Sequence, residues 1–292
     1  MQLPPDSVFD AKALRLGRER TIGLGTRSRV MGILNVTPDS FSDGGLHADT
    51  RVAVAAALAM VGEGADIIDV GGESTRPGAE PVSAVEEQRR ILPVIEALSG
   101  HDAVLISVDT WRAETARLAL AAGAHMVNDV WGLQREPDIA RVAAEAGAAV
   151  AIMHTGRDRE CLPDLIDDQF GWFAPSLEIA RKAGIDDDQI VLDPGFGFAK
   201  DADDNLELMA RFAELHALGL PLLAGTSRKR FIGGLTGREA ADRDVGTVAT
   251  SVALRLAGAA MFRVHNVAFN KDGLAVADAM VQSSRKKGPG HG

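Results

Sequence analysis

Cysteine and long apolar runs are both scarce in this sequence. Cys161 is the single cysteine among 292 residues, which excludes a disulfide framework and fits a reducing, cytoplasmic location. No stretch reaches membrane-spanning length without charges, and the first twenty residues contain no apolar signal core. We therefore expect no contact with a membrane.

Positive charge is also in short supply. The formal net charge is −10 and no long basic run is present, which argues against nucleic acid as a partner. A glycine-rich motif of the GxGxxG type is absent as well, so nothing favours a dinucleotide cofactor. An anionic ligand must therefore be held by a local group of cations against the overall field of the protein.

The chain does contain a regular alternation of two patterns. Short apolar runs, typical of strands buried on both faces, alternate with longer alanine-rich segments of helical period. The apolar runs are 29–34, 66–70, 103–108, 125–128, 148–153, 189–193, 221–225 and 260–264. Helical periodicity follows at 49–65, 83–100, 110–124, 135–148, 204–219, 244–259 and 270–282. This repeat predicts a single-domain α/β fold, the (β/α)8 TIM barrel, with an open doubly wound sheet as the alternative.

The two ends of the chain stand apart from the repeat. We expect residues 1–28 to form an N-terminal extension that covers the barrel floor, and residues 29–284 to form the barrel. The last segment, 285–292, is basic and glycine-rich and is expected to be a flexible tail.

Polar side chains follow several of the predicted strands at the point where each strand ends. Asp69, Asp109, Asn128 and Asp193 all occupy such positions, which converge on one pit in a barrel. Carboxylates and an amide there can bind a flat heterocycle rich in N–H groups. The alternative is that each residue only caps the helix that follows it, and for Asp69 that it braces a loop.

Cations gather at the same predicted mouth. They are Arg76, Arg228, Lys229, Arg230, Arg263 and His265, and they indicate an anionic substrate group such as phosphate. Lys229 is also compatible with a Schiff-base role, and Arg228 with a solvated surface position. His265 and His154 lack a second His or Cys at ligand spacing, so we expect no metal held by protein alone. Mg²⁺ carried in with a diphosphate is the more plausible metal.

Seven motifs occur in order along the chain: MGILNVTPDSFSDGG (31–45), DVGGESTRPGA (69–79), SVDT (107–110), ND (128–129), DPGFGFAK (193–200), GTSRKRFIGG (225–234) and RVH (263–265). Together they resemble the dihydropteroate synthase family of folate biosynthesis. The resemblance implies a (β/α)8 barrel, a homodimer, and condensation of 6-hydroxymethyl-7,8-dihydropterin diphosphate with p-aminobenzoate. Sulfonamides compete for the p-aminobenzoate site in that family.

The resemblance also implies roles for individual residues. The pterin ring would be held by Asp109, Asn128, Asp193, Lys229 and Arg263. The diphosphate would contact Asn35, Arg263 and His265, with Asn35 also near Mg²⁺. The p-aminobenzoate pocket would be shaped by Thr75, Arg76, Pro77, Phe41, Phe198, Lys229 and Arg230. Among these, Asp109, Lys229, Arg263 and Asn35 would carry the catalysis. The loops around 38–45 and 74–78 would close over the substrates.

Three positions depart from the family pattern. Arg230 stands where the family often has serine, and Asn266 stands where the family has aspartate after RVH. The fifth loop, MHTGRDRE (153–160), differs from the common MHM form, which puts its contacts in doubt.

Two other functions remain open on the sequence. One is a pterin-binding methyltransferase barrel, which lacks the ESTRPGA and SRK loops in this form. The other is a barrel that binds pterin without catalysis. Retention of Asn35, Arg263 and His265 favours the synthase, because a pure pterin binder needs no diphosphate site.

Overall fold

The computed structural model describes residues 3–37, 46–73 and 82–286, and its centre is an eight-stranded parallel sheet. Neighbours in the sheet follow the order β8-β7-β6-β5-β4-β3-β10-β9. The ring closes between its end strands through a parallel bridge of Leu192 with Leu222, where Leu192 N donates to Pro221 O at 2.9 Å. The strands are β3 (Arg29–Asn35), β4 (Ile67–Gly71), β5 (Ile106–Asp109), β6 (Met126–Asp129), β7 (Ala149–Met153), β8 (Ile190–Asp193), β9 (Leu223–Ala224) and β10 (Met261–Val264). The predicted single-domain barrel is confirmed.

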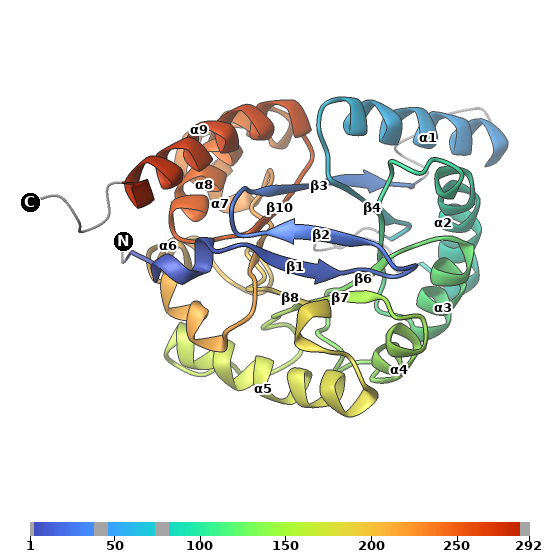
Figure 1. Ribbon diagram of the computed structural model, residues 1–292, viewed down its shortest axis with the longest axis horizontal. Coiled ribbons are helices and arrows are strands. Elements are labelled where there is room, and N and C mark those ends of the chain that lie inside the picture. Colours follow the sequence, from blue (N-terminus) through green and yellow to red (C-terminus); the bar gives the residue numbers. More distant parts are fainter. Residues whose placement is uncertain (1–2, 38–45, 74–81, 287–292) are drawn as a thin grey trace, which may run out of the picture.

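Helices surround the barrel (Figure 1). They are α1 (Leu46–Gly62), α2 (Ala84–Ser99), α3 (Ala113–Ala122), α4 (Asp138–Glu145), α5 (Leu165–Ala183), α6 (Ala202–Ala210), α7 (Arg230–Thr236), α8 (Asp244–Leu256) and α9 (Val267–Lys286). Short 3-10 turns lie at η1 (Asp6–Phe9), η3 (Asp187–Gln189), η4 (Phe212–Leu218) and η5 (Ala240–Asp242). A continuous apolar layer between strands and helices forms the main core.

Three helices differ from the sequence expectation, because the predicted segments include neither α5 nor α7 and extend α6 too far. The periodicity of the sequence does not predict helix α5, because Gly171 and Pro175 interrupt its pattern. This helix begins at Asp164, whose side chain accepts hydrogen bonds from Ile166 N and Asp167 N. The single helix predicted over 204–219 is instead α6 followed by the 3-10 turn η4.

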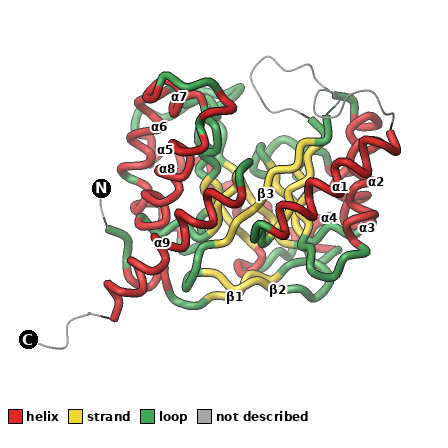
Figure 2. Tube along the Cα trace, turned by 90° about the horizontal axis from the view of Figure 1, so that it is seen from above, coloured by secondary structure: helices red, strands yellow, loops and turns green. Residues whose placement is uncertain are grey.

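An antiparallel hairpin covers the amino-terminal ends of the barrel strands. It consists of β1 (Lys12–Arg15) and β2 (Thr21–Leu24) and crosses the barrel in Figure 1. Its apolar side chains are Leu14, Leu16, Ile22 and Leu24, and they pack against Met31, Ile67, Met126 and Met261 inside the barrel. In Figure 2 it lies below the strands, on the side away from α7.

Long-range ion pairs tie this hairpin to the barrel. Arg15 binds Asp186 and Asp188, which precede β8. Arg255 is fully buried and donates to Gly25 O at 2.8 Å, and Arg285 donates to Phe9 O at 2.8 Å. Arg285 therefore belongs to α9 and to this anchoring network. The rest of the basic tail expected at 285–292, after Lys286, lies outside the described residues.

In the described part of the chain, none of the helices combines the length and the apolar character that crossing a membrane requires.

Candidate active site

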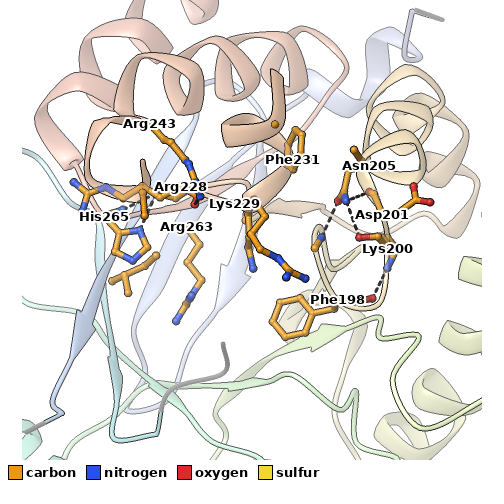
Figure 3. Close-up of a pocket in the computed structure, with 18 of the residues that line it drawn as sticks. Phe198, Lys200, Asp201, Asn205, Arg228, Lys229, Phe231, Arg243, Arg263 and His265 are labelled. Carbon is orange, nitrogen blue, oxygen red and sulfur yellow. Dashed lines mark hydrogen bonds between the residues drawn. The ribbon is translucent and has the colours of Figure 1, made fainter. Parts of the chain in front are cut away.

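A cavity of about 680 Å³ opens at the carboxyl-terminal ends of the strands, opposite the hairpin (Figure 3). The segments that follow β8 and β9 supply most of its wall. Residues predicted from the sequence that line it are Asn35, Asp109, Phe198, Arg228, Lys229, Arg230, Arg263 and His265. The barrel thus gathers at one mouth residues from distant parts of the chain.

Arg263 on β10 is the centre of the polar network at the base of the cavity. Its Nε donates to Asp69 Oδ2 at 2.6 Å, and its Nη2 donates to Asp109 Oδ2 at 2.7 Å. Asn128 Nδ2 donates to the same Asp69 oxygen at 3.0 Å. The sheet makes this possible, because β4, β5 and β6 lie side by side and their register pairs Asp109 with Asn128. Three predicted pterin-binding residues therefore share one hydrogen-bonded network.

Burial dominates the electrostatics of this network. It raises the pKa of Asp109 to about 7, although the Arg263 cation opposes the shift. It also raises the pKa of Asp193, against the hydrogen bond that Gly195 N donates to this carboxylate at 2.7 Å. Burial, with the nearby Arg263 cation, lowers the pKa of Lys229 to about 8. Asp109 and Lys229 therefore change charge near neutral pH, which is typical of functional sites.

Phe198 supplies an aromatic wall between two cations. Lys229 Nζ lies 4.3 Å from the centre of its ring, and the Arg157 guanidinium lies 4.5 Å from it. Both distances are within the range of cation–π attraction. Phe196, by contrast, is fully buried and stacks on Phe212, so it belongs to the core.

The loops that follow β9 and β10, the seventh and eighth of the barrel, form the cationic rim. Ser227 Oγ lies 2.9 Å from His265 Nδ1 and accepts from His265 N at 3.0 Å, which fixes the histidine over the cavity. Arg228 has a left-handed backbone, with φ of 56°, and its guanidinium binds both oxygens of Asp244. The turn therefore sends Arg228 toward α8 and Lys229 toward the cavity.

Arg230 is the rim cation that the structure leaves uncommitted. Its side chain is exposed and lines the cavity, and it makes no hydrogen bond or ion pair with residues 3–37, 46–73 or 82–286. The other p-aminobenzoate positions expected from the sequence, Phe41, Thr75, Arg76 and Pro77, lie outside the described residues, as do both expected closing loops.

The departure at Asn266 has a structural explanation. Asn266 Nδ2 donates to Asp244 Oδ2 at 3.0 Å, and its Oδ1 accepts from Phe269 N at 3.0 Å in the first turn of α9. An aspartate could accept from Phe269 but could not donate to Asp244. The amide therefore links the eighth loop to the carboxylate that holds Arg228.

Sequence reasoning gives too little weight to several residues. Asp69 is fully buried and orients both Arg263 and Asn128, rather than bracing a loop. Arg159, in the charge-rich fifth loop, donates to both oxygens of buried Asp168. Arg157 and Lys200 both line the cavity. A cation directly after the DPGFGFA turn is a usable signal for Lys200, whereas nothing in the sequence singles out Arg157.

The described residues offer no ready-made metal cage. No group of three or more His, Cys, Asp or Glu side chains within 3–37, 46–73 and 82–286 could hold an ion. Asn35 lies at the end of β3, where it lines the cavity with Arg263 and His265.

Comparison with known proteins agrees with this geometry. Residues 31–265 match the family described as pterin binding enzyme. The chain is 43% identical over 264 residues to a dihydropteroate synthase of Clostridium beijerinckii, covering 90% of this chain and 98% of that protein.

The chain is also similar to two structures of Xanthomonas albilineans dihydropteroate synthase. The complex with 4-aminobenzoic acid has a TM-score of 0.86 and 45% identity, over 92% of this chain and 98% of that one. The complex with 7,8-dihydropteroate has a TM-score of 0.82 and 43% identity, over 91% and 98%. This chain therefore belongs to the dihydropteroate synthase family of pterin-binding enzymes.

Proposed function

We propose that the chain condenses 6-hydroxymethyl-7,8-dihydropterin diphosphate with p-aminobenzoate, giving 7,8-dihydropteroate and diphosphate. The observation that carries this proposal is the Arg263 network: one guanidinium bonded to Asp69 and Asp109, with Asn128 on the same carboxylate. The carboxylates of this network can accept hydrogen bonds from the N–H groups of a heterocyclic ring. The Arg263 guanidinium beside them can stabilise a departing anion.

The pterin is assigned to the base of the cavity. Asp109 and Asp193 accept hydrogen bonds from its N–H groups, and the Asn128 amide adds a further polar contact. Lys229 donates to the ring, and the planar Arg263 guanidinium stacks on it. Support comes from the burial of Asn128 and Asp193, which are 3% and 4% exposed and therefore need polar partners.

The diphosphate is assigned to Asn35, Arg263 and His265, with Ser227 holding the histidine in place. Mg²⁺ fits this group, because it commonly takes one or two protein oxygens and completes its shell with phosphate and water. Asn35 supplies such an oxygen on the cavity wall. When bound, the ion would offset negative charge on the diphosphate.

The p-aminobenzoate ring is assigned to the face of Phe198 beside Lys229. Arg230 is positioned to meet its carboxylate, since this guanidinium has no other described partner. Thr75, Arg76, Pro77 and Phe41 are proposed to complete the pocket, on the family resemblance alone.

The proposed reaction is dissociative. The bond between the pterin methylene carbon and the diphosphate oxygen breaks, and its electron pair leaves with diphosphate. Positive charge then develops on the methylene and spreads into the ring, where Asp109 stabilises it electrostatically. The aryl amine of p-aminobenzoate forms the new C–N bond and releases one proton. A closed site keeps water from competing for the cation.

A turnover assay tests the assignment. Purified protein with both substrates and Mg²⁺ is expected to produce dihydropteroate and diphosphate in equal amounts. The Arg263→Ala variant should lose both products, whereas Arg238→Ala, at an exposed arginine, should keep them. Pterin binding without product would instead identify a binding protein.

We also propose a homodimer, formed through α9. Phe269, Val276 and Met280 are 54%, 62% and 51% exposed and lie along one stripe of this helix. Exposed Val245 extends the patch onto α8, which packs beside α9. A second copy is the expected occupant. A Phe269→Glu and Met280→Glu double variant should therefore run as a monomer in light scattering.

The remaining assignments follow from the sequence. We propose that the barrel is the catalytic domain and that 1–28 closes its floor, whereas the flexible basic tail expected at 285–292 can begin only after Lys286, where α9 ends. We place the enzyme in the cytoplasm, where a free thiol such as that of Cys161 stays reduced.

A further inference from the structure

A chain of polar side chains runs from the buried region behind the cavity wall to the wall itself. It begins at Asp168 in the first turn of α5, passes through His154 after β7, and ends at Lys200 after β8. Asp168 and His154 are 3% and 1% exposed. The roles assigned to substrate-binding residues leave this chain unexplained.

The hydrogen bonds define the protonation of each member. Burial by itself would raise the pKa of Asp168, but donation from Arg159, Leu162 N and His154 lowers it below the usual range, so the carboxylate is charged. Burial lowers the pKa of His154 to about 3, so its imidazole is neutral. Its Nε2 lies 2.9 Å from Asp168 Oδ2 and carries the proton, which leaves Nδ1 as an acceptor. Arg159 Nη2 also lies 2.9 Å from this Nε2, but it donates to the charged Asp168 Oδ2, the stronger acceptor.

Lys200 uses the free acceptor of the histidine. Its ammonium lies 2.9 Å from His154 Nδ1, 3.1 Å from Gly195 O and 3.5 Å from Phe198 O. An ammonium has three N–H donors and no acceptor, so these contacts account for all of them. One cation therefore joins the fifth loop to two carbonyls of the sixth. Figure 3 shows the side of this network that faces the cavity, with Lys200 beside Phe198.

The turn gripped by Lys200 carries a group for each substrate. Gly195 N donates to Asp193, which is assigned to the pterin, and Phe198 forms the aryl wall. The turn also has little freedom to move. A Cβ at Gly195, where φ is +69°, would lie 1.9 Å from His154 O. A change in this turn therefore displaces Asp193 and Phe198 together.

We propose that Lys200 and His154 are positioning residues for catalysis, which set the turn of residues 194–199 so that Asp193 and Phe198 face pterin and p-aminobenzoate at the same time. This inference rests on the proposed function and deepens it. It distinguishes Lys200 from Lys229: both line the cavity, but Lys229 is assigned to touch substrate, whereas Lys200 acts through the backbone of the turn.

Substitution of Lys200 provides the first test. Lys200→Met keeps an unbranched stem and removes the three donors. We expect the KM for p-aminobenzoate and the inhibition constant of a sulfonamide to rise together by about tenfold, since hydrogen bonds from a charged donor are the stronger kind. The kcat should change less. Lys182→Gln, at an exposed lysine paired with Glu178 on α5, is the matched control and should leave both constants unchanged.

A pair of histidine variants tests the same chain without touching Lys200. His154→Asn can keep an acceptor near the Nδ1 position, whereas His154→Gln places its amide near Nε2 and leaves Lys200 without that partner. We expect the glutamine variant to reproduce the Lys200→Met values and the asparagine variant to remain near wild type. If Lys200→Met does not fold, the two histidine variants still test the positioning role.

The outcomes distinguish a failure of the proposed function from a failure of the positioning role. A wild-type protein with no turnover overturns the proposed function. An active wild type whose Lys200→Met and His154→Gln variants melt at lower temperature with unchanged KM and inhibition constant shows a merely structural network and overturns the positioning role.

Discussion

The two ends of the barrel use burial for opposite purposes. At the floor, the hairpin buries Leu14 and Leu24 against the first residues of the strands, and the contacts are apolar. At the mouth, strands β4, β5 and β10 instead place charged side chains, Asp69, Asp109 and Arg263, where they are largely removed from solvent. Apolar burial stabilises the fold without directing chemistry, whereas buried charge costs stability and supplies an electrostatic environment for a reaction. Substitutions at the floor should therefore lower the stability of the protein, whereas substitutions at the mouth should lower its activity.

The largest expected effect is at the mouth. Asp109→Asn should lower kcat/KM by about 10²–10³-fold, because it removes charge aimed at the developing cation. It should not lower the melting temperature, because burial already disfavours the charged carboxylate, as its raised pKa shows. Steady-state kinetics and thermal melting of one preparation check both parts. Asp102→Asn, at an exposed position before β5, is the control. A melting temperature that falls in step with activity would contradict the separation.

The converse experiment is at the floor. Leu14→Ala should lower the free energy of unfolding by about 2–4 kcal/mol, the usual cost of truncating a buried leucine. Leu14 is 1% exposed and far from the cavity, so kcat/KM should stay within about twofold of wild type. Urea unfolding measures the first quantity. The same truncation at Leu3, which is 83% exposed, should change neither.

The pH dependence of pterin binding sharpens the description of the mouth. The pKa of Asp109 is raised to about 7, so its charge is lost as the pH falls below that value. The pKa of Lys229 is lowered to about 8, so its charge is lost as the pH rises above that value. Binding of 6-hydroxymethylpterin, which carries no titrating phosphate, should weaken toward tenfold per pH unit on both sides. Calorimetry measures this profile. Asp109→Asn should flatten the acid limb, and an unchanged acid limb would assign it to another group.

The smallest effect is expected at the rim. Asn266→Asp replaces the amide that donates to Asp244 with a second carboxylate, while Phe269 N keeps its acceptor. Arg228 offsets part of the repulsion, so the loss of stability at pH 7 should be below about 1 kcal/mol. Melting at pH 7 and pH 4 checks the cause, because protonation of the introduced carboxylate should restore part of the loss. An equal loss of stability at both pH values would indicate that the shape of the side chain, and not its charge, is the cause.

The repeat of apolar runs and helical segments is enough to predict the barrel, and strand ends are enough to predict its polar pit. Those features depend on short local patterns. The contact between Asp69 and Arg263 is harder to predict, because it joins β4 to β10, which β3 separates in the sheet, and depends on side-chain direction rather than spacing. Helix α5 escapes prediction because Gly171 and Pro175 disturb its period, and tertiary packing overrides that local penalty.

The same limit applies to the Asp168, His154 and Lys200 chain. Each residue has an ordinary local explanation: a carboxylate in a helix first turn, a buried histidine, and a lysine after a turn. Their role depends on hydrogen bonds between three segments that are separate in sequence. The composition of any one segment does not reveal these contacts. Arg159 shows the same effect, since its loop is rich in charge yet its guanidinium is drawn in by Asp168.

The anchoring of the hairpin also bears on how the chain is made. Ser28 binds Asp278, Gly25 O accepts from Arg255, and Phe9 O accepts from Arg285, so a segment made before the barrel is held by helices made after most of it. During synthesis from the amino terminus, Leu14, Leu16, Ile22 and Leu24 have no complete surface to cover until β10 and α9 have left the ribosome. Closure of the floor therefore cannot be completed before α9 has been made. A nascent chain that stalls before α9 carries an exposed apolar hairpin, which is the kind of surface that chaperones bind.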